Sequence, residues 1–138
     1  TLMALPFRVG ALRRAAFAPF AKRRIPPELI DSWMEPSQTD RAVMRDTAKV
    51  TAGFDKRHTL EAASKLGAFD RPTLLAWAPG DRFFPLRYAE RLEQAIPDAR
   101  LETISDAKTF VPLDQPERLA ETVASFVAST EAVGAKSG

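Results

Sequence analysis

The chain contains 138 residues, of which 45% are apolar and 28% are charged, and its net charge at pH 7 is +2. This length suits one domain, and the balance of apolar and charged residues is typical of a soluble globular protein. The chain has no cysteine and one histidine, which excludes disulfides, thiolate metal sites, a cysteine nucleophile and a histidine-based metal cluster. We therefore expect neither a metal nor another cofactor.

Three features of the sequence bear on its location. No apolar run approaches the roughly 20 residues that cross a bilayer, so we expect no contact with a membrane. The N-terminus places its charges after an apolar run and has no small-residue cleavage site, which argues against a signal peptide. The absence of cysteine fits a reducing cytoplasm, where we expect the protein to be. The first residue is Thr1 rather than Met, as in an interior fragment or a processed product.

The N-terminal 24 residues are basic and contain no acid; their charges are Arg8, Arg13, Arg14, Lys22, Arg23 and Arg24. Such a cluster can bind phosphate, nucleic acid or a membrane surface. Solvated helix faces explain it equally well, and no aromatic residues interleave with the charges as a base-stacking platform requires. We therefore expect no nucleic acid and no membrane as partner.

The pattern is helical throughout residues 1–70. Apolar residues recur at helical spacing in four segments, namely 7–24 (interrupted at Pro19), 26–34, 39–50 and 59–69. Thr39 and Thr59 are the predicted N-caps of the third and fourth helices, and Gly67 is the predicted end of the fourth. Four short amphipathic helices joined by turns with proline or glycine predict a cap-like region over residues 1–70.

The pattern changes after Pro72. It predicts a buried strand at 73–78, a helix at 86–96, a second strand at 100–104 and a helix at 114–129. Asp114 is the predicted N-cap of the last helix, with Glu117 completing a capping box. The polar tail 130–138 is predicted to be disordered. This order predicts an α/β fold with one parallel βαβ unit and a closing C-terminal helix.

A parallel sheet of two strands is incomplete. It has two open edges, and the segment "TLLAWA" (73–78) is too apolar to face water. Helices can cover its faces, but they cannot supply the missing ladder hydrogen bonds. We therefore expect a second polypeptide to complete the sheet, either a missing N-terminal half or another copy of this chain.

Two stretches of residues 71–129 carry a family resemblance. "WAPGDRFFP" (77–85) and "ISDAKTFVPLDQPE" (104–117) resemble the acid-bearing and histidine-bearing segments at the end of an α/β-hydrolase. The resemblance implies that Asp81 is the acid of a catalytic triad and that Thr109 stands where the family keeps its histidine. Residues 1–70 then correspond to the helical cap of such enzymes. The family's nucleophile motif, Gly-x-Ser-x-Gly, is absent from the sequence.

The threonine decides what this chain can do by itself. A threonine hydroxyl does not titrate near neutral pH, so Thr109 cannot take and return a proton as an imidazole does. It can donate a hydrogen bond to Asp81, which would keep the loop geometry without its catalysis. His58 would be the general base only if the cap folded down over the core, and a surface role is the simpler interpretation.

Two functions follow from the resemblance. In the first, the chain is the cap and C-terminal portion of a protein whose complete form hydrolyses an ester or similar small carbonyl substrate, while the chain alone is not catalytic. In the second, it belongs to a non-catalytic homologue that binds a small apolar ligand. A substrate tunnel beneath the cap is one explanation for Phe17, Phe20, Trp33 and Met34. Core packing is the other.

Overall fold

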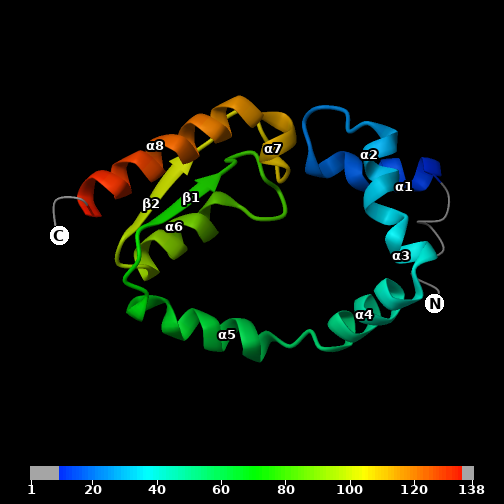
Figure 1. Ribbon diagram of the computed structural model, residues 1–138, viewed down its shortest axis with the longest axis horizontal. Helices are drawn as coiled ribbons and strands as arrows, with labels where there is room; N and C mark the ends of the chain where they lie inside the picture. Colours follow the sequence, from blue (N-terminus) through cyan, green and yellow to red (C-terminus); the bar gives the residue numbers. More distant parts are fainter. Residues whose placement is uncertain (1–9, 135–138) are drawn as a thin grey trace. The chain divides into compact units, whose positions relative to one another are not determined.

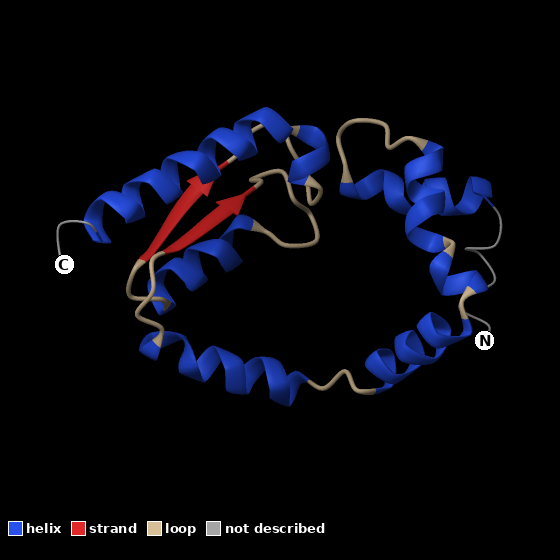
Figure 2. Ribbon diagram, in the orientation of Figure 1, coloured by secondary structure: helices blue, strands red, loops and turns tan. Residues whose placement is uncertain are grey.

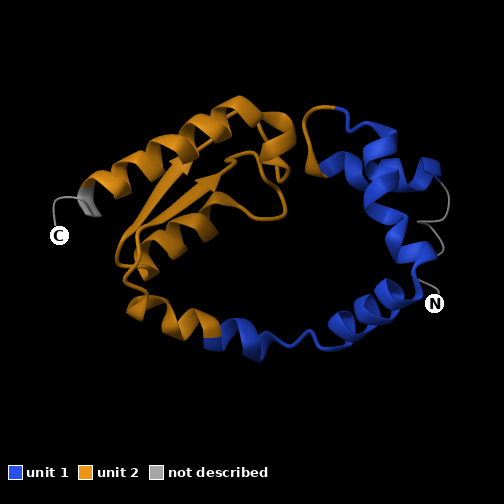
Figure 3. Cartoon of the chain, in the orientation of Figure 1, with its two compact units in different colours: residues 1–19, 24–61 blue, residues 20–23, 62–138 orange. Residues whose placement is uncertain are grey.

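A computed structural model of the chain describes residues 10–134, with side chains as far as Ala132. The predictions for residues 1–9, Arg8 among them, and for residues 135–138 lie outside this range. The chain divides into two compact units, which Figure 3 shows in different colours. The first consists of Thr1–Pro19 and Arg24–Glu61, and the second of Phe20–Arg23 and Ala62–Gly138. The predicted division at residue 70 stays a prediction.

The first unit is built from helices, as the pattern predicted (Figure 2). Its elements are α1 (Gly10–Phe17), α2 (Pro27–Met34), α3 (Pro36–Thr39), α4 (Arg41–Ala52) and the first part of α5 (Lys56–Lys65). A 3₁₀ turn, η3 (Ala18–Phe20), follows α1 at the predicted interruption. Ile25 and Ile30 are buried, and the Phe17 ring packs on Trp33 with the ring centroids 5.8 Å apart.

Two of the predicted helix caps are wrong. Thr39 lies inside α3, and Asp40 caps α4 by accepting hydrogen bonds from Ala42 N and Val43 N. Thr59 lies inside α5, which begins at Lys56, because Asp55 already accepts from the backbone amide of Arg57. In both cases an aspartate close to the predicted threonine is the acceptor, and a carboxylate is a strong acceptor for amides at a helix N-terminus.

The second unit contains the strands (Figure 1). After the end of α5 and a 3₁₀ turn, η4 (Leu66–Ala68), it continues through β1 (Thr73–Trp77), α6 (Leu86–Ala95), β2 (Ala99–Thr103), α7 (Val111–Asp114) and α8 (Pro116–Gly134). The predicted end of the fourth helix, Gly67, falls within η4. The two strands are parallel, in a register that runs from Thr73 opposite Ala99 to Trp77 opposite Thr103. The predicted parallel βαβ unit is confirmed.

The buried core of the second unit lies at the carboxyl ends of the two strands. Ala78, Ile104, Ala107 and Val111 are buried together, and Leu119 of α8 packs against them. All five residues of β1 are only half-buried, although the sequence predicted burial on both faces. Val123 and Val127 of α8 are 43% and 45% exposed. Two strands therefore leave apolar surface that the described residues do not cover.

The last two predicted elements need correction. Asp114 is not the N-cap of α8; it is the final residue of α7, and its carboxylate accepts hydrogen bonds from Lys22, Arg23 and Lys108. The tail is not disordered throughout, because α8 continues to Gly134. Local spacing suggested a capping box, but distant backbone amides compete for the same carboxylate.

Candidate active site

Asp81 lies in the turn that follows β1, at the carboxyl end of the strand. Its amide donates to Ala78 O at 3.1 Å, which closes the turn. Its Oδ1 accepts hydrogen bonds from Phe83 N at 2.8 Å and Phe84 N at 3.0 Å. An aspartate that binds the amides two and three residues ahead holds its own loop in shape. The Asp81 carboxylate is therefore held in position by the backbone of its own loop.

Thr109 lies in the loop that follows β2, and its side chain reaches Asp81. Thr109 Oγ1 donates to Asp81 Oδ1 over 2.9 Å, and both residues are half-buried. The predicted hydrogen bond is therefore present, between residues that are 28 positions apart. Oδ1 thus receives three donors: two backbone amides and this hydroxyl. A carboxylate held in this way has a defined direction, whether or not a base stands beside it.

Gly80 allows the two loops to come this close. A Cβ atom at Gly80 would lie 2.9 Å from Ala107 O, a backbone atom that has no flexible end to move aside. Any residue with a side chain would therefore push the Asp81 loop away from the Thr109 loop. The sequence contained the signal as "PGD" (79–81), but the turn alone did not show that a second loop requires the glycine.

A cavity of about 220 Å³ lies beside this pair. It is lined by Ala76, Trp77, Ala78, Asp81, Phe84, Thr109 and Val111. Trp77 Nε1 donates to Phe84 O at 2.8 Å, so the indole is tied to the loop that carries Asp81. The lining combines apolar and aromatic surface with one carboxylate and one hydroxyl, a composition that suits a small organic molecule.

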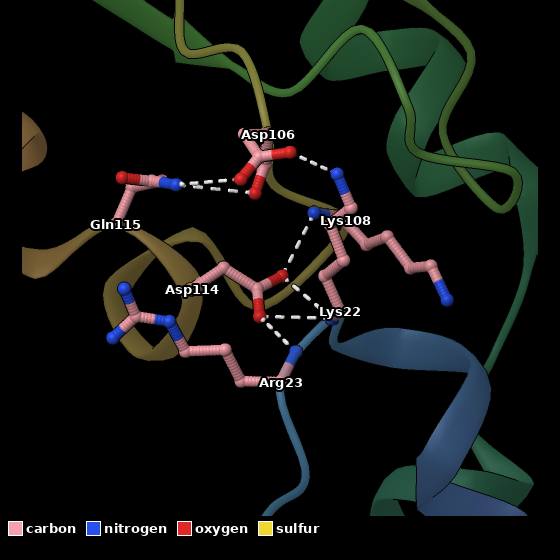
Figure 4. Close-up of polar contacts among 6 residues, drawn as sticks. All are labelled: Lys22, Arg23, Asp106, Lys108, Asp114 and Gln115. Atoms are coloured by element: carbon pink, nitrogen blue, oxygen red, sulfur yellow. Dashed lines mark hydrogen bonds and ion pairs between the residues drawn. The ribbon is translucent and has the colours of Figure 1, made fainter.

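Sequence reasoning missed the role of Asp114, which is fully buried. Its two carboxylate oxygens accept from the backbone amides of Lys22, Arg23 and Lys108 at 2.8 to 2.9 Å (Figure 4). Burial raises the pKa of Asp114, but the three amides and the Lys108 charge together outweigh it, so the pKa lies below the usual aspartate value. Asp114 is therefore a buried, ionised residue that holds the segment of Lys22 and Arg23 against the loop that carries Thr109.

The other candidate residues are divided between the two units. His58 is exposed in α5 and belongs to the first unit, whereas Asp81 belongs to the second. The four proposed tunnel residues are divided: Phe17, Trp33 and Met34 belong to the first unit and Phe20 to the second. Of the basic residues, Arg13 forms an ion pair with Asp31 at 3.1 Å. Within residues 10–134 no group of three potential ligands could hold a metal ion.

Several known proteins are similar to this chain over part of their length. No family model matches the chain. It is 27% identical over 106 residues to the uncharacterized hydrolase YugF of Bacillus subtilis, covering 77% of this chain and 37% of that protein. Among solved structures it is similar to the esterase EaEST of Exiguobacterium antarcticum (20% identity, TM-score 0.64, covering 92% of this chain and 46% of that one). It is also similar to CarC, a serine hydrolase of carbazole degradation (17% identity, TM-score 0.70, covering 87% and 47%).

A third structure agrees: MGS-MChE2, an α/β-hydrolase enzyme from a lagoon-sediment metagenome, is 22% identical with a TM-score of 0.59, covering 74% of this chain and 45% of that one. This chain has part of the α/β-hydrolase fold. It spans less than half the length of each of these proteins. In this portion of the α/β-hydrolase fold, no helix among residues 10–134 has the length and apolar character needed to cross a membrane.

Proposed function

We propose that this chain is the cap and C-terminal portion of a cytoplasmic hydrolase whose complete form acts on an ester or a similar small carbonyl substrate. The observation that carries the proposal is the Asp81 carboxylate, which is held at the end of β1 by two backbone amides and faces the Thr109 loop. A triad acid needs this fixed direction to orient a general base. The esterase and serine hydrolase among the structural neighbours support the reaction class.

The chain is not catalytic by itself in this proposal. The described residues supply an acid at Asp81 and a hydroxyl at Thr109, but the sequence has no Gly-x-Ser-x-Gly nucleophile motif. Thr109 cannot act as a general base because its hydroxyl stays protonated at neutral pH. Asp81 and Thr109 therefore form an incomplete triad, and a nucleophile would come from the remainder of the protein.

Ester hydrolysis by the complete protein tests the proposal. We expect the 138-residue chain to be inactive on p-nitrophenyl esters and the complete protein to turn them over slowly. Thr109→His in the complete protein should raise the rate by about a thousandfold or more, because a general base is restored beside Asp81. Adding Asp81→Asn should remove that gain. Fast turnover by the native protein would show that our interpretation of Thr109 is wrong.

A second function is favoured by the same hydrogen bond. Because the Thr109 hydroxyl donates to Asp81 Oδ1, the pair is satisfied without a histidine, as a non-catalytic homologue requires. The cavity of about 220 Å³ beside it would then bind a small apolar ligand. Complete protein that binds an apolar ester analogue without turnover, and gains no activity with Thr109→His, would establish this second function in place of the first.

We also infer that another polypeptide segment covers β1, either the missing N-terminal half or a second copy of this chain. Among the described residues, β1 pairs with β2 alone. The Leu101 amide of β2 is satisfied by Glu93 Oε1 at 2.9 Å, whereas no described residue pairs with the far edge of β1. Each buried amide or carbonyl left unpaired costs about 1–3 kcal/mol.

Size-exclusion chromatography with light scattering on the 138-residue chain tests this inference. We expect self-association or aggregation, since the strand edge and the exposed side chains of Val123 and Val127 remain uncovered. The control is the complete protein, which should elute as a defined species. A well-folded monomer of the 138-residue chain that stays soluble at high concentration would contradict the inference.

A further inference from the structure

The segment Phe20–Arg23 is far in sequence from the two strands, but it packs with the second unit, which contains them. It interrupts the first unit and is grouped with the second. Phe110 N donates to Phe20 O at 2.8 Å, Lys22 N donates to both oxygens of Asp114 at 2.8 Å, and Arg23 N donates to Asp114 Oδ1 at 2.8 Å. Ala21, between them, is buried. Four consecutive residues are thus held against the loop that carries Thr109.

The Phe20 ring contacts both loops of the candidate active site. It stacks on Phe83 with the centroids 4.3 Å apart and the planes 9° apart. It also stacks on Phe110, at 5.4 Å and 21°. Phe83 donates its amide to Asp81, and Phe110 directly follows Thr109. The ring therefore links the two loops whose side chains meet in the Asp81–Thr109 hydrogen bond.

Asp114 joins the segment Phe20–Arg23 to the loop that carries Thr109. Besides the amides of Lys22 and Arg23, it accepts from Lys108 N at 2.9 Å, and Lys108 precedes Thr109 (Figure 4). Polar side chains beside Asp114 form a second set of contacts, which centres on Asp106. Lys22 Nζ pairs with Asp106, and Gln115 Nε2 donates to Asp106 O at 3.3 Å and to its Oδ2 at 3.4 Å. Asp106 has a positive φ of 63°, which aspartate tolerates better than most residues.

We propose that Phe20–Arg23 is a strap that positions Asp81 against Thr109, and that Asp114 is the positioning residue that anchors the strap. Asp114 holds the strap and the Thr109 loop through one carboxylate, while Phe20 carries the constraint across to the Asp81 loop. The geometric part of this proposal is independent of hydrolysis. Only its catalytic meaning rests on the proposed function.

The proposal distinguishes Asp114 from a residue that merely stabilises its own loop. If the strap acts across the site, loosening Asp114 should loosen the amides of Phe83 and Phe84, which bind Asp81 and do not contact Asp114. Losing the Phe20 ring should have the same effect on these two amides while the Asp114 contacts stay in place. A local role would leave Phe83 and Phe84 unchanged in both variants.

Nuclear magnetic resonance on the complete protein provides the test, without any measurement of turnover. In the wild type, the amide proton shifts of Lys22, Arg23 and Lys108 should titrate together in acid, below the usual aspartate range, because they report one carboxylate whose folded pKa is lowered. In Asp114→Asn this shared titration should vanish, and hydrogen exchange of the Phe83 and Phe84 amides should accelerate about tenfold.

Two further variants make the result decisive. Phe20→Leu should keep the titration of the three amides but accelerate exchange at Phe83 and Phe84, and it decides the matter if Asp114→Asn fails to fold. Asp40→Asn removes a carboxylate that also accepts two backbone amides, but in the first unit, and should leave Phe83 and Phe84 unchanged. Exchange at Phe83 and Phe84 that is unaffected in Phe20→Leu and in folded Asp114→Asn would overturn the proposal. Neither outcome depends on whether the complete protein is a hydrolase.

Discussion

Each of the two units is stabilised internally by contacts of a different range. In the first, α4 and α5 contain no buried residue, and Asp40 accepts hydrogen bonds from amides two and three positions away. In the second, Asp114 is fully buried and binds amides 91 and 92 positions away. The same type of side chain, an aspartate, thus serves as a local helix cap in the first unit and as a tertiary anchor in the second. We expect the buried carboxylate of Asp114 to contribute more to stability than the exposed carboxylate of Asp40.

Replacing these two aspartates by alanine should give the largest difference. Asp114→Ala leaves three backbone amides without their acceptor and should lower the free energy of unfolding of the second unit by about 3 kcal/mol. Asp40→Ala removes one helix cap and should cost about 1 kcal/mol. Urea unfolding measures the first through Trp77 fluorescence in a Trp33→Phe background and the second through helical circular dichroism. Equal losses would show that range and burial do not separate the two units.

The same pair should respond differently to acid. The folded pKa of Asp114 is lowered, so its contribution is present above the unfolded aspartate pKa and is lost as pH falls through the lower folded value. As pH falls below the unfolded aspartate pKa the wild type should therefore lose stability in the second unit, measured by urea unfolding at each pH. In Asp114→Asn that part of the pH dependence should be absent. An unchanged acid dependence in the variant would assign the effect to other carboxylates.

Replacing one glycine in each unit by alanine should give a smaller difference in stability. Gly80→Ala places a Cβ atom 2.9 Å from Ala107 O and should cost about 1–3 kcal/mol by forcing the two loops apart. Gly53→Ala, at the end of α4, meets its nearest backbone oxygen at 3.4 Å and has an ordinary φ of −87°. It should be neutral or stabilise by up to about 1 kcal/mol. Thermal unfolding of both variants measures the difference, and a tolerated Gly80→Ala would contradict the close approach.

Removing the Thr109 hydroxyl should have the smallest effect. Thr109→Val keeps the shape of the side chain but removes one of three donors to Asp81 Oδ1, so the second unit should lose about 1 kcal/mol. Thr109→Ser keeps the donor and should cost less. Trp77 fluorescence during urea unfolding measures both variants. If Val and Ser are equally destabilising, the methyl group rather than the hydrogen bond holds Thr109 in place.

The sequence by itself determined the parts that depend on short-range pattern. The apolar run at 73–78 predicted β1. The family resemblance from Trp77 to Pro85 and around Thr109 implied the position of Asp81 and allowed a hydrogen bond from Thr109, and the structure contains that bond. Periodicity predicted helices before residue 70, because apolar residues that recur every three to four positions lie on one face of a helix. Helix caps were predicted less well, because threonine and aspartate compete for the same amides.

Only the tertiary structure decided which distant groups meet. No local pattern shows that Asp114 binds Lys22 and Arg23, that Phe20 stacks between Phe83 and Phe110, or that Gly80 faces Ala107 O. Propensity and periodicity act over a few residues, whereas these contacts join positions that are far apart in the sequence and meet only in the folded chain. Asp114 was therefore predicted to be a cap from its local spacing, whereas in the structure its carboxylate accepts from the amides of Lys22, Arg23 and Lys108 and is an anchor.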